Sequence, residues 1–129
     1  MRLLLDTHIA IWSILESHRI PPSVKSLIGD TANEVFVSSC SLWEIAIKSQ
    51  RGRASSLPID ATMARKVFAR AGFEILDIRV EHILAIERLP ELHRDPFDRL
   101  IIAQALVEPL RLVTHDAAVA RYSDTIIRC

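Results

Sequence analysis

Short apolar runs alternate with longer amphipathic stretches along this chain. Runs of β-branched, aromatic and aliphatic residues predict strands buried on both faces. Such strands are expected at residues 3–5, 35–37, 73–78, 110–113 and 125–127. Apolar positions at helical spacing, with Ser, Asp or Pro at their starts and Gly near several ends, predict helices. These are expected at residues 9–15, 21–29, 41–48, 60–70, 80–88, 96–106 and 117–122.

This alternation predicts an α/β fold with a mostly parallel sheet of four to five strands and helices on both faces. A chain of 129 residues has the usual size of one domain, so residues 1–129 are expected to form a single unit. Sheets of this kind bind ligands outside the carboxyl ends of their strands. The chemistry is therefore expected near Asp6 and the turn Thr114-His115-Asp116.

Composition excludes few classes of function. Sixteen Lys and Arg balance sixteen Asp and Glu, so net charge neither favours nor excludes an anionic partner. Cys40 and Cys129 lack the spacing of a metal site, which fits a reducing cytoplasm. Asp6 and His8 interrupt the apolar start, so neither a signal peptide nor a membrane span is expected.

Acidic residues follow two of the predicted strands, and each has a structural alternative. Asp6 ends the first strand and could cap the helix that follows, because Asp accepts well from the free amides of a first turn. Asp116 follows the fourth strand and could cap the last helix in the same way. Asp95 precedes Pro96, a favoured first helical residue, and is assigned to capping.

Two further acids lie in early turns of predicted helices. Glu44 follows Ser41 by three residues, the spacing of a capping box. Its apolar neighbours Trp43 and Ile45 argue against that role alone, because burying an unpaired carboxylate is costly. Asp98 begins a helix that is apolar on nearly every side, hence buried, so its charged start is expected to open onto something polar.

In a doubly wound sheet the positions of Asp6, Glu44, Asp98 and Asp116 converge on one crevice. Clustered carboxylates repel one another unless a cation lies among them. Ligands that are all oxygen suit Mg²⁺ or Mn²⁺ rather than zinc. The residues therefore predict a divalent metal site, and four independent helix caps remain the alternative.

Four ordered blocks carry a family resemblance: LLLDTHIAIW, SLWEIAIK, HRDPFDRLIIAQA and LVTHDAAV. With them the chain resembles PIN-domain nucleases, and most closely the VapC toxins of bacterial toxin–antitoxin pairs. The resemblance covers essentially the whole chain. It departs from the family after Gly52, where many relatives carry Lys-Leu and this chain has Arg53-Ala54-Ser55-Ser56 before Leu57.

The resemblance implies a PIN-like fold and a metal-dependent endoribonuclease toxin that hydrolyses RNA phosphodiesters in the cytoplasm with Mg²⁺ or Mn²⁺. It implies that the catalytic and metal-binding residues are Asp6, Glu44, Asp98 and Asp116, and that the hydroxyl of Thr114 supports them. It also implies a cognate antitoxin and a homodimer. At least one of the two tryptophans, Trp12 and Trp43, is expected to pack in the core. A tryptophan that is partly exposed would suit an interface with another protein.

A basic run lies beside the predicted site. Lys48 follows Glu44 by four residues and shares its helix face, and Arg51 and Arg53 come shortly after. These three are predicted to contact RNA phosphates, which bind mainly to Lys and Arg. The alternative is a solvated helix end, where cations are favoured in any case.

No histidine is assigned to catalysis, because a bound divalent ion can generate the nucleophilic water itself. His8, His93 and His115 are instead expected to be surface or packing residues.

Other acidic α/β folds fit less well. A response-regulator receiver expects an acidic pair near the first strand, and a haloacid-dehalogenase-type phosphatase expects a second Asp where this chain has His8. A PIN-like nucleic-acid or protein binding module without turnover remains the alternative function.

Overall fold

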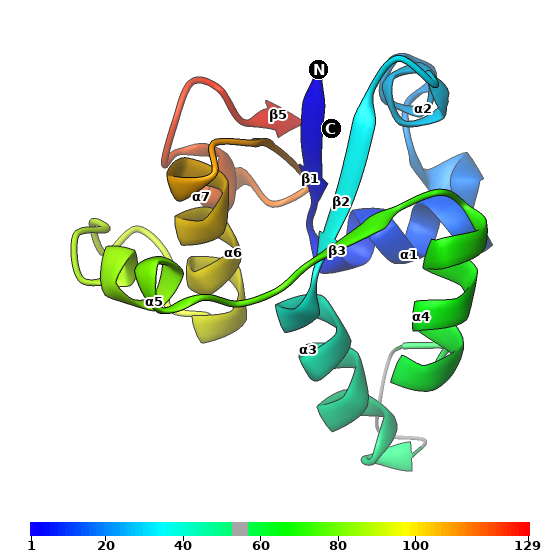
Figure 1. The fold of residues 1–129 in the computed structure, drawn as a ribbon, viewed down its shortest axis with the longest axis horizontal. Coiled ribbons are helices and arrows are strands. Elements are labelled where there is room, and N and C mark those ends of the chain that lie inside the picture. The colour runs from blue at the N-terminus through cyan, green and yellow to red at the C-terminus, as the bar shows by residue number, and fades with distance from the viewer. Residues whose placement is uncertain (53–56) are drawn as a thin grey trace.

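The computed structural model of the chain describes residues 1–52 and 57–129. Within them lies one five-stranded sheet, ordered β3-β2-β1-β4-β5, in which all neighbouring strands are parallel (Figure 1). The strands are β1 (Arg2–Leu5), β2 (Glu34–Ser38), β3 (Glu74–Leu76), β4 (Arg111–Thr114) and β5 (Ile127–Arg128). The prediction of an α/β fold with a parallel sheet is confirmed.

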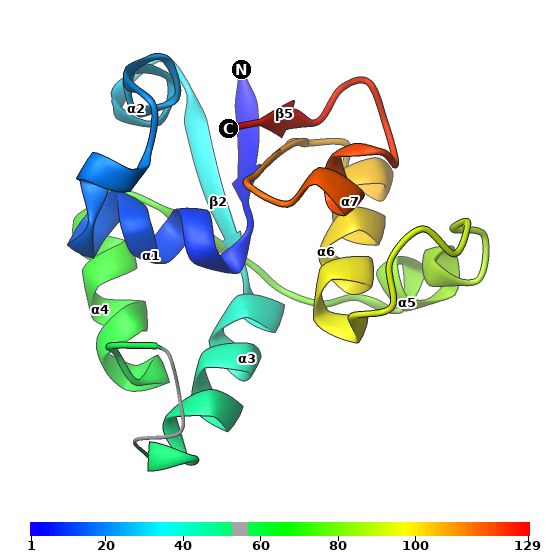
Figure 2. The ribbon, with the colours of Figure 1, turned by 180° about the vertical axis from the view of Figure 1, so that it is seen from behind.

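Helices cover both faces of the sheet, as Figures 1 and 2 show from opposite sides. Helices α1, α2 and α4 lie on one face, and α5, α6 and α7 lie on the other. The helices are α1 (Thr7–Leu15), the 3-10 turn η1 (Ser17–Arg19), α2 (Pro22–Gly29), α3 (Ser39–Ser49), α4 (Ala61–Arg70), α5 (Val80–Ile86), α6 (Pro96–Val107) and α7 (Ala117–Ala120).

The central strand β1 shows why the strands appear in the sequence as apolar runs. Its side chains alternate between faces: Leu3 and Leu5 pack into the core under α1, whereas Leu4 packs into the core under α6. All three are fully buried. A strand covered on both sides needs no polar positions, so it reads as continuous hydrophobicity.

Several predicted boundaries were wrong. Helix α3 begins at Ser39 and is capped by Ser38, whose Oγ accepts from the amide of Cys40. The Ser41–Glu44 capping box is therefore wrong, because both residues lie inside the helix. The third strand is shorter than residues 73–78, since only Glu74–Leu76 pairs with β2.

Across residues 1–52 and 57–129, no helix combines the length and the apolar character needed to cross a bilayer.

Candidate functional site

A cavity of about 420 Å³ opens where the carboxyl ends of β1 and β4 meet α1, α3 and the first turn of α6. All four acids predicted from the sequence line it. The full lining is Asp6, His8, Trp12, Glu44, Lys48, His93, Asp95, Asp98, His115 and Asp116. Segments far apart in sequence thus bring their carboxylates to one hollow.

Asp6 uses its two carboxylate oxygens differently. Oδ1 accepts from the amide of Ile9 at 2.9 Å and caps α1. Oδ2 accepts from the hydroxyl of Thr114 at 2.5 Å. The residue is only 8% exposed. Burial raises its pKa, and the hydrogen bonds from Thr114 and Ile9 oppose that shift. Asp6 therefore caps α1 with Oδ1, while Oδ2 pairs with Thr114 and the residue lines the cavity.

Thr114 joins the first and last acids of the site. Besides donating to Asp6, its Oγ1 accepts from the backbone amide of Asp116 at 3.0 Å. Asp116 Oδ1 caps α7 by accepting from the amide of Ala118 at 2.8 Å. Burial would raise the pKa of Asp116, but hydrogen bonds from backbone amides and His93 outweigh it and lower the pKa.

Glu44 is almost completely enclosed, with 4% of the residue exposed. Thr7 Oγ1 donates to its Oε1 at 2.8 Å, and Lys48 Nζ lies 2.7 Å from its Oε2. Thr7 is the first residue of α1. The contact spans two elements, so sequence spacing gave no sign of it.

Asp98 lies in the first turn of α6, behind the cap Asp95. Asp95 Oδ1 accepts from the amides of Phe97 and Asp98 at 2.8 and 3.2 Å, as the capping prediction required, although Asp95 also borders the cavity. Burial raises the pKa of Asp98 to about 7, the charge of Asp95 adds to the shift, and His93 opposes it.

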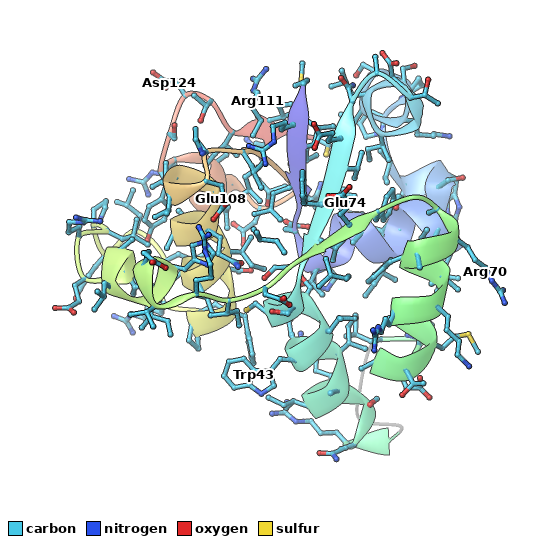
Figure 3. The ribbon with its side chains drawn as sticks, viewed as in Figure 1. Trp43, Arg70, Glu74, Glu108, Arg111 and Asp124 are labelled. Carbon is cyan, nitrogen blue, oxygen red and sulfur yellow. The ribbon has the colours of Figure 1, made fainter. Side chains whose placement is uncertain are left out.

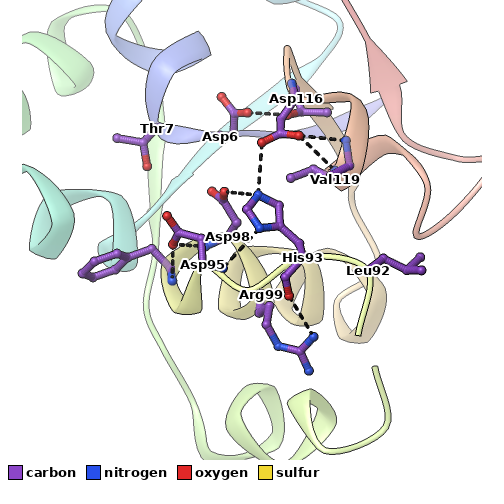
Figure 4. Close-up of polar contacts among 12 residues, drawn as sticks. Asp6, Thr7, Leu92, His93, Asp95, Asp98, Arg99, Asp116 and Val119 are labelled. Atoms are coloured by element: carbon purple, nitrogen blue, oxygen red, sulfur yellow. Dashed lines mark hydrogen bonds and ion pairs between the residues drawn. The ribbon is translucent and has the colours of Figure 1, made fainter. Parts of the chain in front are cut away.

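His93 lies between two of the acids (Figure 4). Its Nε2 is 3.0 Å from Asp98 Oδ2 and 3.1 Å from Asp116 Oδ2. Its Nδ1 accepts from the backbone amide of Asp95 at 3.1 Å. An amide N–H can donate only to an unprotonated ring nitrogen, so the ring proton sits on Nε2 and points at the two carboxylates.

His8 and His115 are exposed, as expected of surface residues, although both also line the cavity. His93 differs from that expectation, because it is half-buried and pairs with two acids of the cavity, Asp98 and Asp116. The one available sequence signal was the closeness of His93 to Asp95 and Asp98. Nothing in that spacing revealed that the ring also reaches Asp116.

The three basic residues predicted to contact RNA differ in position. Lys48 lines the cavity and pairs with Glu44. Arg51 is exposed just beyond the end of α3 and is not part of the cavity lining. Arg53 lies outside the described residues.

The donor set suits a hard divalent cation. Raised pKa values at Asp6 and Asp98 mean that the protein destabilises the charged carboxylates, a cost that a bound cation would relieve. Asp98 and Asp116 each offer one carboxylate oxygen, and these two atoms lie within 4.8 Å of each other and of a ring nitrogen of His93. Carboxylate oxygens at this density are the ligands that Mg²⁺ and Mn²⁺ prefer.

Comparison with known proteins identifies a family and a fold. The PIN domain family matches residues 3–124. The structure is similar to one chain of VapBC2 from Rickettsia felis bound to a promoter DNA fragment, with a TM-score of 0.70 and 20% identity over 100% of this chain and 98% of that chain.

It is also similar to a chain of DNA-bound VapBC from Salmonella typhimurium, with a TM-score of 0.67 and 17% identity over 100% of this chain and 97% of that one. The corresponding values for FitAcB from Neisseria gonorrhoeae are 0.66 and 17%, over 98% and 96%. At these identities the likeness concerns the fold. Among curated proteins, none matches the sequence.

Proposed function

The chain belongs to the PIN-domain family, and from this premise we propose that it is a metal-dependent endoribonuclease acting as the toxin of a toxin–antitoxin pair. One observation carries the proposal: four carboxylates from separate segments line a single cavity, and burial raises the pKa of two of them, Asp6 and Asp98. Because clustered carboxylates repel one another, a bound cation would stabilise such a site.

The carboxylates of Asp6, Glu44, Asp98 and Asp116 would hold Mg²⁺ or Mn²⁺. When bound, the ion supplies a water of lowered pKa and neutralises charge on the phosphoryl oxygens.

The protein's own groups prepare the site by fixing side chains. Thr114 donates to Asp6, and Thr7 donates to Glu44. Hydrogen bonds to ligating carboxylates orient them and preserve metal affinity. Lys48, whose ammonium group lies at the cavity beside Glu44, would also attract an RNA phosphate.

The toxin role rests on the family and on the solved relatives. The similar chains come from VapBC complexes and from FitAcB, so a cognate antitoxin is the expected partner, with RNA as substrate and the cytoplasm as the place of action.

A homodimer is proposed as well. Trp43 is 55% exposed and stands out from α3 (Figure 3), as expected of an aromatic residue at a protein interface. Light scattering that shows a monomer at micromolar concentration would contradict the dimer.

Asp6→Asn tests the nuclease assignment. Asn is as good an N-cap as Asp, so α1 should survive while the carboxylate is lost. Cleavage of a fluorescent RNA in Mg²⁺ is expected to fall by at least about 100-fold, a loss typical of essential site groups. Asp60→Asn is the matched control, because Asp60 caps α4 through the same contact, to the amide of Met63, away from the cavity. Equal cleavage by Asp6→Asn and the parent would show that the catalytic assignment is wrong, and a parent protein that never cleaves RNA would favour the binding module.

A further inference from the structure

Trp12 stands at the border of two neighbouring cavities. It lines the acidic cavity described above and a second cavity of about 340 Å³. His8 lines both as well, so the two hollows adjoin across these two side chains. The second cavity also includes Arg19 and Glu16 from the turn that follows α1. A chain molecule lying in the acidic cavity can therefore continue past the indole.

Aromatic and basic groups contact the indole, and the apolar residues Ile11, Leu57 and Pro58 also line the second cavity. The His115 ring meets it edge-on, with centroids 5.4 Å apart and planes at 68°, and the His8 ring is 5.8 Å away. The guanidinium carbon of Arg19 lies 4.4 Å from the indole centroid. Glu16, the carboxylate in this lining, is 3.1 Å from Arg19 and pairs with it. Both members of that pair are substantially exposed.

This combination suits a base and its phosphate better than an aliphatic side chain. Aromatic rings and guanidinium planes are the surfaces on which unpaired bases stack, and arginine also attracts the phosphate backbone. An exposed cation–π contact is weaker than a base–aromatic stack, so a base can displace Arg19 from the indole. Arg19 remains near, held by Glu16, where it can meet a phosphate.

We propose that Trp12 forms the wall of a nucleobase subsite that holds one unpaired base of single-stranded RNA next to the phosphate in the acidic cavity. The inference rests on the proposed ribonuclease function and adds to it a substrate class. A base inside a duplex already has both faces stacked, so the subsite selects unpaired RNA.

Tryptophan fluorescence tests the subsite directly. Trp43→Phe leaves Trp12 as the single reporter among the two tryptophans. Asp6→Asn suppresses cleavage, and Mg²⁺ is kept in the buffer so that the acidic cavity can still receive the phosphate. A short single-stranded oligoribonucleotide is titrated beside one of equal length and charge in which the central nucleotides are abasic. The base-containing RNA is expected to quench Trp12, and the abasic RNA is expected to leave it bright.

Affinity gives a second measure. Trp12→Leu keeps an apolar side chain but removes the aromatic face, and it should weaken binding by roughly 5- to 100-fold. Trp12→Phe, which keeps a ring, should retain most of the affinity. Met63→Ala is the control, because Met63 is an exposed apolar residue of α4 that lines neither cavity, and it should change binding by less than about threefold. Circular dichroism checks that each variant folds.

Each outcome separates this inference from the proposed function. Equal binding of the two RNAs without quenching, with Trp12→Leu cleaving at an unchanged KM, overturns the subsite and leaves the ribonuclease. Base-dependent quenching in a protein that never cleaves RNA supports the subsite and overturns the catalytic proposal. If a cognate antitoxin quenches Trp12 fluorescence and RNA does not, the two adjoining cavities bind a protein segment, and the subsite is overturned.

Discussion

Ser38 Oγ donates a hydrogen bond of 2.5 Å to Gln104 Oε1, and both side chains are fully buried. Ser38 caps α3, which carries Glu44, and Gln104 lies within α6, which carries Asp98. The bond therefore links the two helices that bring these carboxylates to the cavity. It does so from inside the protein, without contact with the cavity itself.

Removing this link should loosen the site. Gln104→Leu leaves the Ser38 hydroxyl without its acceptor, and an unsatisfied buried group costs about 1–3 kcal/mol. Urea denaturation is expected to report a loss of that size, together with weaker Mn²⁺ binding by calorimetry. A double-mutant cycle with Ser38→Ala isolates the pair, since groups in contact are expected to couple. Strictly additive losses would mean that the two side chains act independently.

His93 is expected to donate a hydrogen bond to Asp98 and Asp116 rather than to ligate the metal. Its Nε2–H faces Asp98 and Asp116, and its Nδ1 is engaged by the Asp95 amide. His93→Ala should therefore lower the Tm of the metal-free protein and enlarge the rise in Tm when Mn²⁺ is added, because the ion replaces the lost donor.

Electron paramagnetic resonance provides the decisive control for this prediction. Bound Mn²⁺ in the parent protein should lack magnetic coupling to a histidine nitrogen. A nitrogen coupling that disappears in His93→Ala would instead identify His93 as a metal ligand.

The metal-free protein should lose stability as the pH rises. The pKa of Asp98 is about 7 in the folded state against 3.8 for the ordinary group, so the native state binds the extra proton between those values. Stability then falls from about pH 4 through pH 7. Asp98→Asn should remove this loss and raise the Tm in EDTA at about pH 8 by a few degrees, equivalent to about 1 kcal/mol.

At about pH 3 the same substitution should change the Tm little, because Asp98 is then mostly protonated in both the folded and the unfolded state. Asp124→Asn, on the exposed stretch between α7 and β5, provides a matched control. A Tm difference for Asp98→Asn that is the same at both pH values would refute the assignment of this pH dependence to Asp98.

The basic run after α3 should contribute to RNA affinity through phosphates. Charge reversal of Arg51 and Arg53 to Glu is expected to weaken binding and to flatten the dependence of log affinity on log salt by about 0.7 for each phosphate that the variant no longer neutralises. Reversal of the exposed pair Arg65 and Lys66 on α4 changes net charge equally and is the control. Identical salt slopes for both double variants would remove Arg51 and Arg53 from the RNA-binding surface.

The sequence predicted the sheet well because its strands are buried on both faces. Leu3, Leu4 and Leu5 have no solvent side, so the run itself marks a strand between helices. The parallel arrangement then follows from strand–helix alternation, and with it the edge at which Asp6 and Asp116 meet.

Helix starts were harder to predict, because several residues near each start can cap. Ser38, Ser39 and Ser41 are all suitable N-caps, and the choice of Ser38 depends on where β2 stops pairing with its neighbours. The length of β3 is likewise set by its pairing with β2.

The sequence by itself determined the kinds of groups and the elements that carry them: acids at strand ends and helix starts, on a parallel sheet. Only the tertiary structure decided which contacts they make. Thr7 reaches Glu44, and His93 reaches Asp116, across segments that no local pattern links. The physical reason is that backbone periodicity fixes the direction of a side chain within its own element, whereas its partner depends on how the elements pack.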